Sequence, residues 1–398
     1  MNPVDPVVIV SAARTPLGAF QGALAGVPAT DLGAHAIKAS LQRSGVSADQ
    51  VDEVLMGCVL PAGLGQAPAR QAALSAGLSY ATGCTTISKV CGSGMKAVML
   101  AHDALMAHSA KVVLAGGMES MSNAPYLLPK ARAGLRLGHG QVLDHMFLDG
   151  LEDAYAPDTQ GQLMGQFAEL CASKFGFTRQ DQDAFAIEST TRAQRAIEQG
   201  CFDWEVAPVG KLGRSGQDEL VHDEQPPKAQ IDKIPRLKPA FRPDGTVTAA
   251  NASSISDGAA ALMLMRASTA QQLGVQPLAR IVGHANHAQE PRWFSTAPAG
   301  AVRKLLTQVG WASHDVDLWE INEAFAVVTL AAMRELDLPH DRVNVHGGAC
   351  ALGHPIGATG ARLIVTLLGA LRQRGQQRGV ATLCIGGGEA TAVAIELL

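Results

Sequence analysis

The last third of the chain repeats a pattern from its first third, and this internal repeat limits the folds that are possible. A glycine-rich turn leads into an apolar helical segment in CGSGMKAVMLAHDAL, which begins at Cys91, and again in GHPIGATGARLIVTLLGAL, which begins at Gly353. Both copies continue into an apolar strand pattern and a Gly-Gly-x-Glu sequence. A duplicated unit of this kind predicts two equivalent turns that meet across a pseudo-twofold axis, so that reactive groups on both turns share one pocket.

The spacing of the two copies agrees only loosely. The helix glycines Gly94 and Gly360 lie 266 positions apart, whereas the strand-end glycines Gly117 and Gly387 lie 270 positions apart. We attribute the four additional positions to an extra turn, RQRGQQ, between helix and strand in the second copy.

Strand and helix patterns alternate along the first part of the chain. Residues 6–12 form a continuous apolar run, the pattern of a strand that is covered on both faces. The sequence then predicts a helix capped by Thr30, a strand over 51–60, a helix over 66–76, a helix from Cys91 to about His108 and a strand from 111. This order indicates an α/β protein with a buried sheet and helices on both sides. With 398 residues, 47% of them hydrophobic, the chain is long enough for two or three domains.

The pattern changes between residues 123 and 248. Residues 125–149 show no sustained period, a long helix begins at Thr178 and stops at Gly200, and residues 211–242 are polar and contain four prolines. Strand patterns at 247–250 and 261–265 return the chain to a core. We therefore expect one core half from residues 1–122 plus 249–270, an inserted loop domain over 123–248, and a second core half over 271–398.

Composition argues against several classes of function. The net charge of −4 gives no reason to expect nucleic-acid binding, and no run of 18 apolar residues predicts a membrane helix. We expect no signal or transit peptide, because the first basic residue is Arg14. The seven cysteines form no CxxC pair, which favours reduced thiols in a cytoplasm over disulfides or structural zinc.

The segment SKVCGSGMKA places Cys91 at the predicted start of a helix. The unpaired N–H groups and the positive dipole end of a helix N-terminus lower a cysteine pKa, which favours the nucleophilic thiolate. Gly92 and Gly94 leave room for a substrate to approach the sulfur. Alone, the motif is weak, because a free cysteine is commonly a small buried hydrophobe.

Three residues of the C-terminal half strengthen the argument. Asn322 lies in INEAFA, His354 lies between glycine and proline in LGHPIG, and Cys384 precedes three glycines in TLCIGGG. Each has an ordinary structural explanation, as a capping asparagine, a loop histidine or a buried cysteine. Their joint occurrence with Cys91 favours a catalytic site.

With these motifs in order, the chain resembles the thiolase family, and within it the acetyl-CoA acetyltransferase branch. The resemblance runs from VIVSAARTPLGAF at Val8 through NASSISDGAA at Asn251 to the C-terminus. It implies a duplicated αβαβα five-layer core, an inserted loop domain and a homotetramer. It also implies coenzyme A thioesters as substrates and no permanently bound cofactor.

The resemblance assigns roles to individual residues. Cys91 carries the acyl group, His354 takes its proton, and Cys384 removes a proton from the α-carbon of the second acetyl-CoA. The N–H groups of Cys91 and Gly386 would hold one oxyanion, whereas His354 and a water positioned by Asn322 would hold the enolate oxygen.

Further positions match those that line the family's pantetheine tunnel. These are Ser253, Phe241, Ala324 and Phe325, with Arg214 a looser match for the adenosine end. Members that condense acetyl-CoA often carry His-Met-Gly near the acyl pocket, where this chain has Leu163, Met164 and Gly165. Leucine cannot hydrogen-bond the substrate, so this difference bears on acyl-chain preference. Residues 132–154 resemble the family's tetramerisation loop.

Alternative functions remain open from the sequence. A broader degradative 3-ketoacyl-CoA thiolase would share all of these motifs. A ketoacyl synthase would need a second histidine in place of Cys384. A non-catalytic acyl-CoA-binding or lipid-binding protein needs no paired thiols, and a cysteine hydrolase needs no second cysteine.

Overall fold

One continuous hydrogen-bonded sheet folds into two similar halves. The structure is a computed structural model that describes residues 5–210 and 219–398. In the N-half sheet the strand order is β1 (Val7–Arg14), β8 (Ser256–Arg266), β5 (Val112–Ser120), β3 (Glu53–Gly57) and β4 (Gly83–Ile87). In the C-half sheet it is β9 (Ala279–Ala288), β12 (Glu389–Leu397), β11 (Arg378–Ile385) and β10 (Leu318–Ile321). The short β2 (Gly18–Ala19) pairs with β8.

The two half-sheets have the same topology. In each, two neighbouring strands are parallel, β3 with β5 and β10 with β11, and the next strand, β8 or β12, is antiparallel. The N-half carries one further parallel strand, β4, at its edge. The halves join where β1 pairs with β9, through Val8 opposite Arg280 and Ile9 opposite Ala279. The predicted duplication is therefore confirmed.

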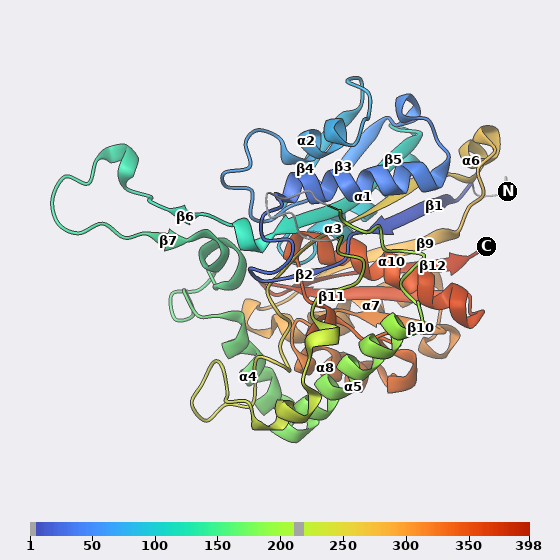
Figure 1. Ribbon diagram of the computed structural model, residues 1–398. Coiled ribbons are helices and arrows are strands. Elements are labelled where there is room, and N and C mark those ends of the chain that lie inside the picture. The colour runs from blue at the N-terminus through green and yellow to red at the C-terminus, as the bar shows by residue number, and fades with distance from the viewer. Residues whose placement is uncertain (1–4, 211–218) are drawn as a thin grey trace.

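Helices form the remaining layers (Figure 1). The helices α3 (Ser93–Met106) and α10 (Ile356–Arg374) pack against each other between the half-sheets, where α10 is buried on all sides over most of its length. The helices α1 (Ala29–Ser44) and α2 (Pro68–Ser75) cover the outer face of the N-half sheet. The helix α7 (Ala297–Val309) covers the C-half sheet, and α8 (Ala326–Leu336) packs against α7. The order of layers is αβαβα, as predicted.

Glycines at the crossing of α3 and α10 bring the two helix backbones into contact. A Cβ atom on Gly94 would lie 2.9 Å from the backbone nitrogen of Ala361, and one on Gly360 would lie 2.4 Å from that of Met95. The two contacts are related by the 266-residue repeat, so the pseudo-twofold axis passes between them. Side chains at either position would force the helices apart.

The strands that follow these helices correct the predicted spacing. The Asp52 carboxylate accepts hydrogen bonds from the N–H groups of Lys111 and Val112, and Asp317 does the same for Gln377 and Arg378. The strand starts are thus also 266 residues apart, and RQRGQQ adds no residue. The match at 270 positions was wrong. Gly117 lies inside β5, whereas Gly387 lies in the turn after β11.

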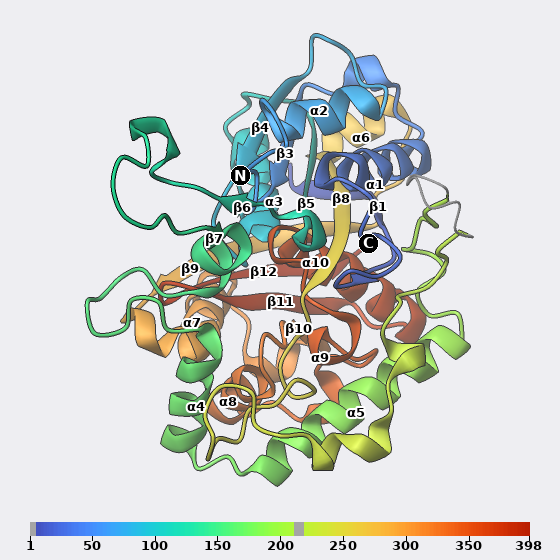
Figure 2. The ribbon, with the colours of Figure 1, turned by 60° about the vertical axis from the view of Figure 1, so that its left-hand side comes forward.

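The remaining helices and strands lie mostly outside these layers. Within residues 123–248, the strands β6 (Tyr126–Leu127) and β7 (Leu143–Asp144) form the base of an arm that projects from the body (Figures 1 and 2). The helices α4 (Met164–Phe175) and α5 (Arg179–Glu198) follow, and both contact α8. The long helix predicted from Thr178 is α5, and Thr178 caps it, accepting a hydrogen bond from the Asp181 N–H. The short helices α6 (Ala267–Leu273) and α9 (Ala349–Leu352) lie in the two core halves.

Several predicted boundaries were wrong. Helix α1 begins at Ala29 after Pro28, and Thr30 lies inside it rather than capping it. The strand predicted over 51–60 shortens to β3, the strand β4 was not predicted, and residues 247–250 form only an isolated bridge from Thr248 to Pro239. Within the described residues, none of the helices has the length and apolar composition needed to cross a bilayer.

A buried carboxyl group ties the two halves together. Glu119, near the end of β5, accepts hydrogen bonds from the N–H groups of Val59, Leu60 and Gly357, the last in the first turn of α10. Burial raises the pKa of Glu119 to about 7, although the three N–H donors favour its ionised form. Ionised Glu119 therefore lowers the free energy of unfolding, and this loss of stability grows as the pH rises.

Replacing Glu119 with glutamine is expected to remove this pH dependence. Between its unfolded pKa near 4.5 and its folded pKa of about 7, Glu119 binds more protons in the folded chain, so wild-type stability falls as pH rises. Relative to wild type, the variant should gain up to about 3 kcal/mol of unfolding free energy between about pH 5 and about pH 8. Urea unfolding at both pH values measures this shift. The exposed Glu198→Gln is the control, and a shift of opposite sign would contradict the prediction.

Candidate active site

A cavity of about 360 Å³ lies where the reactive turns of the two halves meet. Cys91 and Val90 come from the turn before α3, His354 from the turn before α10, and Gly386 from the turn after β11. The rest of the lining is mostly apolar and includes residues of the insertion, among them Phe147, Leu151, Leu163, Met164 and Phe241. Both copies of the repeat therefore contribute to one pocket, as the sequence predicted.

The turn that carries Cys91 is strained and tightly held. Val90 has a φ of 46°, a left-handed conformation that is unfavourable for a β-branched residue. The Ser93 hydroxyl accepts a hydrogen bond from the Lys89 N–H at 2.8 Å and donates one to the Val90 carbonyl at 2.7 Å. A Cβ atom on Gly92 would lie 2.3 Å from the Ile385 side chain, so the turn packs directly against the end of β11.

Burial dominates the acidity of Cys91. It raises the pKa of the thiol to about 11, whereas the backbone N–H groups of Gly386 and of Cys91 itself act in the opposite direction. The prediction of a lowered pKa at a helix N-terminus was therefore wrong for the free protein, because burial outweighs these N–H groups. The helix α3 itself starts only at Ser93, two residues after the cysteine. The thiol must lose its proton to a neighbouring base when it attacks.

His354 has the protonation state of such a base. Burial, with a smaller effect from the Arg362 charge, lowers its pKa to about 3, so the ring is neutral. Its Nδ1 lies 2.6 Å from the Thr359 hydroxyl oxygen, and that hydroxyl donates to the Pro355 carbonyl at 2.9 Å. The oxygen must then accept from Nδ1–H, which assigns the free lone pair to Nε2. Asn322 Nδ2 lies 3.5 Å from Nε2, as a donor would.

Thr359 was not identified from the sequence, and it is a positioning residue for His354. Replacing it with valine, which has the same shape and no hydroxyl, is expected to lower kcat about tenfold with little change in KM, because a hydrogen bond worth about 1.5 kcal/mol no longer fixes the tautomer. Thr359→Ser should restore most of the rate. Steady-state kinetics of both variants test the role, and equal rates in the valine and serine variants would contradict it.

Cys384, Asn322 and Gly386 lie next to this pair. Cys384 is fully buried near the end of β11, where burial and the nearby Cys91 raise its pKa well above the ordinary value. The Asn322 N–H donates to the Thr382 carbonyl at 3.0 Å, which places the residue beside β11. Cys384 and Asn322 do not contribute to the cavity lining, whereas Gly386 does. The structure therefore brings all five predicted catalytic residues to one region, three of them at the cavity surface.

The predicted acyl-CoA contacts form one apolar wall. Ser253, Phe241, Ala324, Phe325, Leu163 and Met164 all line the cavity. The Phe241 and Phe325 rings meet edge to face with centroids 5.9 Å apart, and a Cβ atom on Gly165 would lie 2.4 Å from the Phe241 ring. The seventh predicted residue, Arg214, lies outside the described residues.

Other lining residues were not predicted. Phe147, Gly150 and Leu151 come from the segment after the arm, whereas Ile255 and Ile356 lie inside the recognised motifs but were not singled out. Thr359 has one signal in the sequence, a hydroxyl residue five positions after the histidine in the first turn of a predicted helix. The others show no local pattern, because only the folded chain brings them together.

Comparisons with known proteins agree with this geometry. Residues 7–268 match the thiolase N-terminal domain, and residues 275–397 match the thiolase C-terminal domain. The chain is 50% identical to acetyl-CoA acetyltransferase 2 of Arabidopsis thaliana over 401 residues, which cover 100% of this chain and 98% of the relative. It is 49% identical to acetyl-CoA acetyltransferase of Pseudomonas aeruginosa, covering 98% of this chain and 99% of the relative.

A solved structure has the same fold. The crystal structure of Acat5 thiolase from Ascaris suum in complex with coenzyme A superposes with a TM-score of 0.93 and 42% sequence identity. The match covers 99% of this chain and 100% of the other.

Proposed function

This chain belongs to the thiolase family, and from that premise we propose that it is an acetyl-CoA C-acetyltransferase. It condenses two molecules of acetyl-CoA to acetoacetyl-CoA and free CoA, and it catalyses the reverse thiolysis. The proposal rests on one observation: Cys91, His354 and Gly386 meet in a single cavity, and the mostly apolar lining of that cavity suits a pantetheine chain.

In the first half-reaction Cys91 becomes acylated. His354 Nε2 takes the thiol proton as the sulfur attacks the thioester carbonyl, and the bond from that carbon to the CoA sulfur breaks. The proton then passes from His354 to the departing CoA thiolate. The N–H groups of Cys91 and Gly386 already approach the Cys91 sulfur, so they are placed to donate to the oxygen of the tetrahedral intermediate.

In the second half-reaction a carbon–carbon bond forms. The thiolate of Cys384 takes a proton from the α-carbon of acetyl-CoA, and the resulting enolate carbon attacks the carbonyl of acetyl-Cys91. The bond from that carbon to the Cys91 sulfur breaks, and the proton passes from Cys384 to Cys91. Burial raises the pKa of the Cys384 thiol, so that thiol must give its proton to solvent before it acts as the base, and it returns to the thiolate form when it passes the α-proton on to Cys91. Asn322 Nδ2, which lies 3.5 Å from His354 Nε2, is the side-chain donor placed to support the enolate oxygen.

Leu163 bears on the length of the acyl chain. It lines the cavity as the residue before α4, and its apolar side chain gives a longer acyl group a surface on which to pack. A second candidate is therefore a degradative 3-ketoacyl-CoA thiolase of broader chain length. Thiolysis rates with acetoacetyl-CoA and 3-ketohexanoyl-CoA separate the two, and a higher specificity constant for the longer substrate would favour the second candidate.

Replacing Leu163 with histidine is expected to narrow the specificity. The polar ring removes apolar contact from the additional methylene groups, so the specificity constant for 3-ketohexanoyl-CoA should fall about tenfold relative to that for acetoacetyl-CoA. Leu163→Met, which keeps an apolar side chain of similar volume, is the matched control. An unchanged ratio in the histidine variant would show that Leu163 does not contact the acyl chain.

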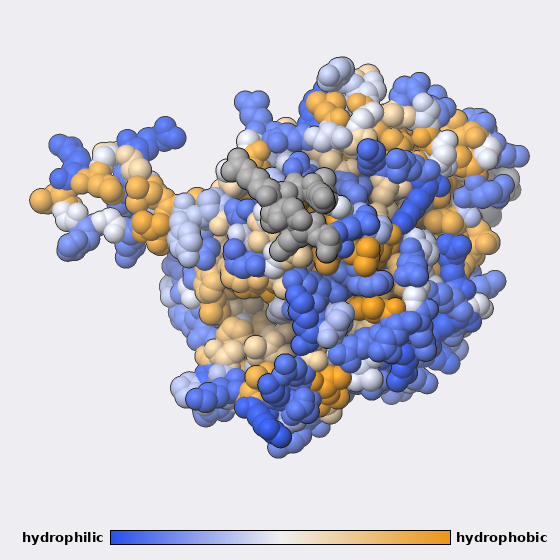
Figure 3. All heavy atoms as spheres, viewed as in Figure 1, coloured by the Kyte–Doolittle hydropathy of each residue, from blue (hydrophilic) through white to orange (hydrophobic). Residues whose placement is uncertain are grey.

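Assembly and location are further parts of the proposal. The arm between β6 and β7 exposes Leu128, Leu135, Leu137 and Val142. Figure 3 shows that apolar residues cover part of its surface. Burying them against other copies of the chain would support a homotetramer. Light scattering of wild type and of a chain lacking 128–142 tests this assembly. We also propose a cytoplasmic location, supported by seven free cysteines, and cell fractionation tests it.

A further inference from the structure

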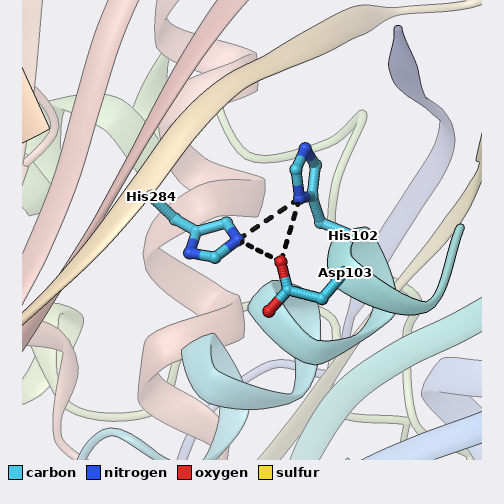
Figure 4. Close-up of side chains that lie close together, drawn as sticks. All are labelled: His102, Asp103 and His284. Carbon is cyan, nitrogen blue, oxygen red and sulfur yellow. Dashed lines mark hydrogen bonds and ion pairs between the residues drawn. The ribbon is translucent and has the colours of Figure 1, made fainter. Parts of the chain in front are cut away.

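Two histidines and an aspartate converge at the seam between the core halves (Figure 4). His102 and Asp103 lie near the C-terminal end of α3 in the N-half, and His284 lies in β9 of the C-half. His284 Nε2 is 3.2 Å from His102 Nδ1 and 2.9 Å from Asp103 Oδ1. The third side of this triangle, from His102 Nδ1 to Asp103 Oδ1, measures 3.4 Å.

These distances match the ligand sphere of a small metal ion. Zn²⁺ binds imidazole nitrogen and carboxylate oxygen at about 2.0–2.2 Å, and a tetrahedral arrangement at that radius separates neighbouring ligand atoms by about 3.3 Å. The three sides of the triangle lie close to this value. The ligand set, two imidazoles and one carboxylate, is one that zinc uses when its fourth position is left for water.

Hydrogen bonding alone satisfies the three atoms less well. If His284 Nε2–H and His102 Nδ1–H both donate to Asp103 Oδ1, the contact from His102 is long, at 3.4 Å, and the two N–H groups face each other across 3.2 Å. A cation between the three atoms would use all three lone pairs at once. The histidine side chains are mostly buried, at 18% and 15% exposed, whereas that of Asp103 is 54% exposed, so an ion can reach the group from solvent.

We propose that His102, Asp103 and His284 form a binding site for a divalent transition-metal ion such as Zn²⁺. The ion would join α3 of one half to β9 of the other, near the edge where β1 and β9 connect the half-sheets. Cys91 lies beyond the opposite end of α3, on the order of 15 Å away along the helix. The site is therefore structural, and acetyl transfer does not depend on it.

Titration of the metal-free protein with Zn²⁺, followed by calorimetry, tests the proposal. Wild type is expected to bind one equivalent at this site, and His284→Gln and Asp103→Asn should weaken that binding by at least about 100-fold. His314→Gln is the matched control, because His314 also lies beside an aspartate, Asp315, but is 85% exposed. Zinc should raise the melting temperature of wild type and of the control, and should not raise that of the other two variants.

Cobalt separates this site from the cysteines. Co²⁺ bound to nitrogen and oxygen ligands shows weak visible bands, whereas thiolate ligands add an intense charge-transfer band, and the latter would place the ion at Cys91, Cys384 or another thiol. That result, equal zinc affinity in all four proteins, or no binding by wild type would overturn the proposal. Asp103→Asn keeps the test valid if His284→Gln fails to fold, since the Asp103 side chain is largely exposed. Thiolysis by the variants reports separately on the proposed function.

Discussion

Replacing Cys91 with alanine is expected to abolish acyl transfer, with kcat falling by a factor on the order of 10⁵ to 10⁶. The reason is that no other thiol lines the cavity that holds His354 and Gly386 among the residues the structure describes. Mass spectrometry after brief incubation with acetyl-CoA should find one added acetyl group on the wild-type peptide that contains residue 91, and none on the variant.

The control for this experiment is Cys201→Ala, because Cys201 is also a free thiol but does not line the cavity. That variant should acylate like wild type. If wild type itself carried no acetyl group on Cys91, the protein would be an acyl-CoA-binding member of the fold rather than an enzyme. Release of free acetate in place of acetoacetyl-CoA would indicate a hydrolase.

Replacing Cys384 with alanine is expected to separate the two half-reactions. The variant should still form acetyl-Cys91, because His354 is untouched, but condensation and thiolysis should fall by about 10² to 10⁴, the contribution of a general base. Single-turnover acylation and steady-state thiolysis measure the two steps independently.

A neighbouring cysteine supplies the control for lost packing. Cys171 is buried in the same apolar cluster as Cys384, and burial likewise raises its pKa, to about 11. Cys171→Ala leaves a similar gap in the core and should retain most of the condensation rate. Failure of Cys384→Ala to acylate would show that the roles of the two cysteines have been misassigned. Equal losses in both variants would point to packing rather than proton transfer.

Much of the fold and the site could be predicted because the signals are local and repeated. The apolar run at 6–12, the Thr178 cap and the two glycine-rich turns each report on their own segment, and the repeat then relates one half to the other. The residues Cys91, His354 and Cys384 could be identified because their motifs resemble a known family. Each of these inferences depends on a short stretch of sequence.

The rest depends on contacts that no short segment contains. The acidity of Cys91 is set by burial beneath the insertion and the opposite half, which outweighs the local N–H groups that the sequence reveals. The role of Thr359 depends on the orientation of one imidazole. The strand β4 is half-exposed at the edge of the sheet and has little apolar pattern to mark it. The predicted offset of 270 residues was too long by four because it matched Gly117 with Gly387. Gly117 lies inside β5, whereas Gly387 lies in the turn after β11.

The bare crossing of α3 and α10 sets the spacing of the chemistry. Cys91 lies three residues before Gly94, and His354 lies six residues before Gly360. A shift of either helix at the crossing would therefore move the reactive group at its N-terminal end. One methyl group at either glycine would wedge the helices apart and displace nucleophile and proton acceptor in opposite directions. The alignment of sulfur and imidazole thus depends on glycine at two positions, Gly94 and Gly360, both of which lie at the helix crossing and outside the cavity lining.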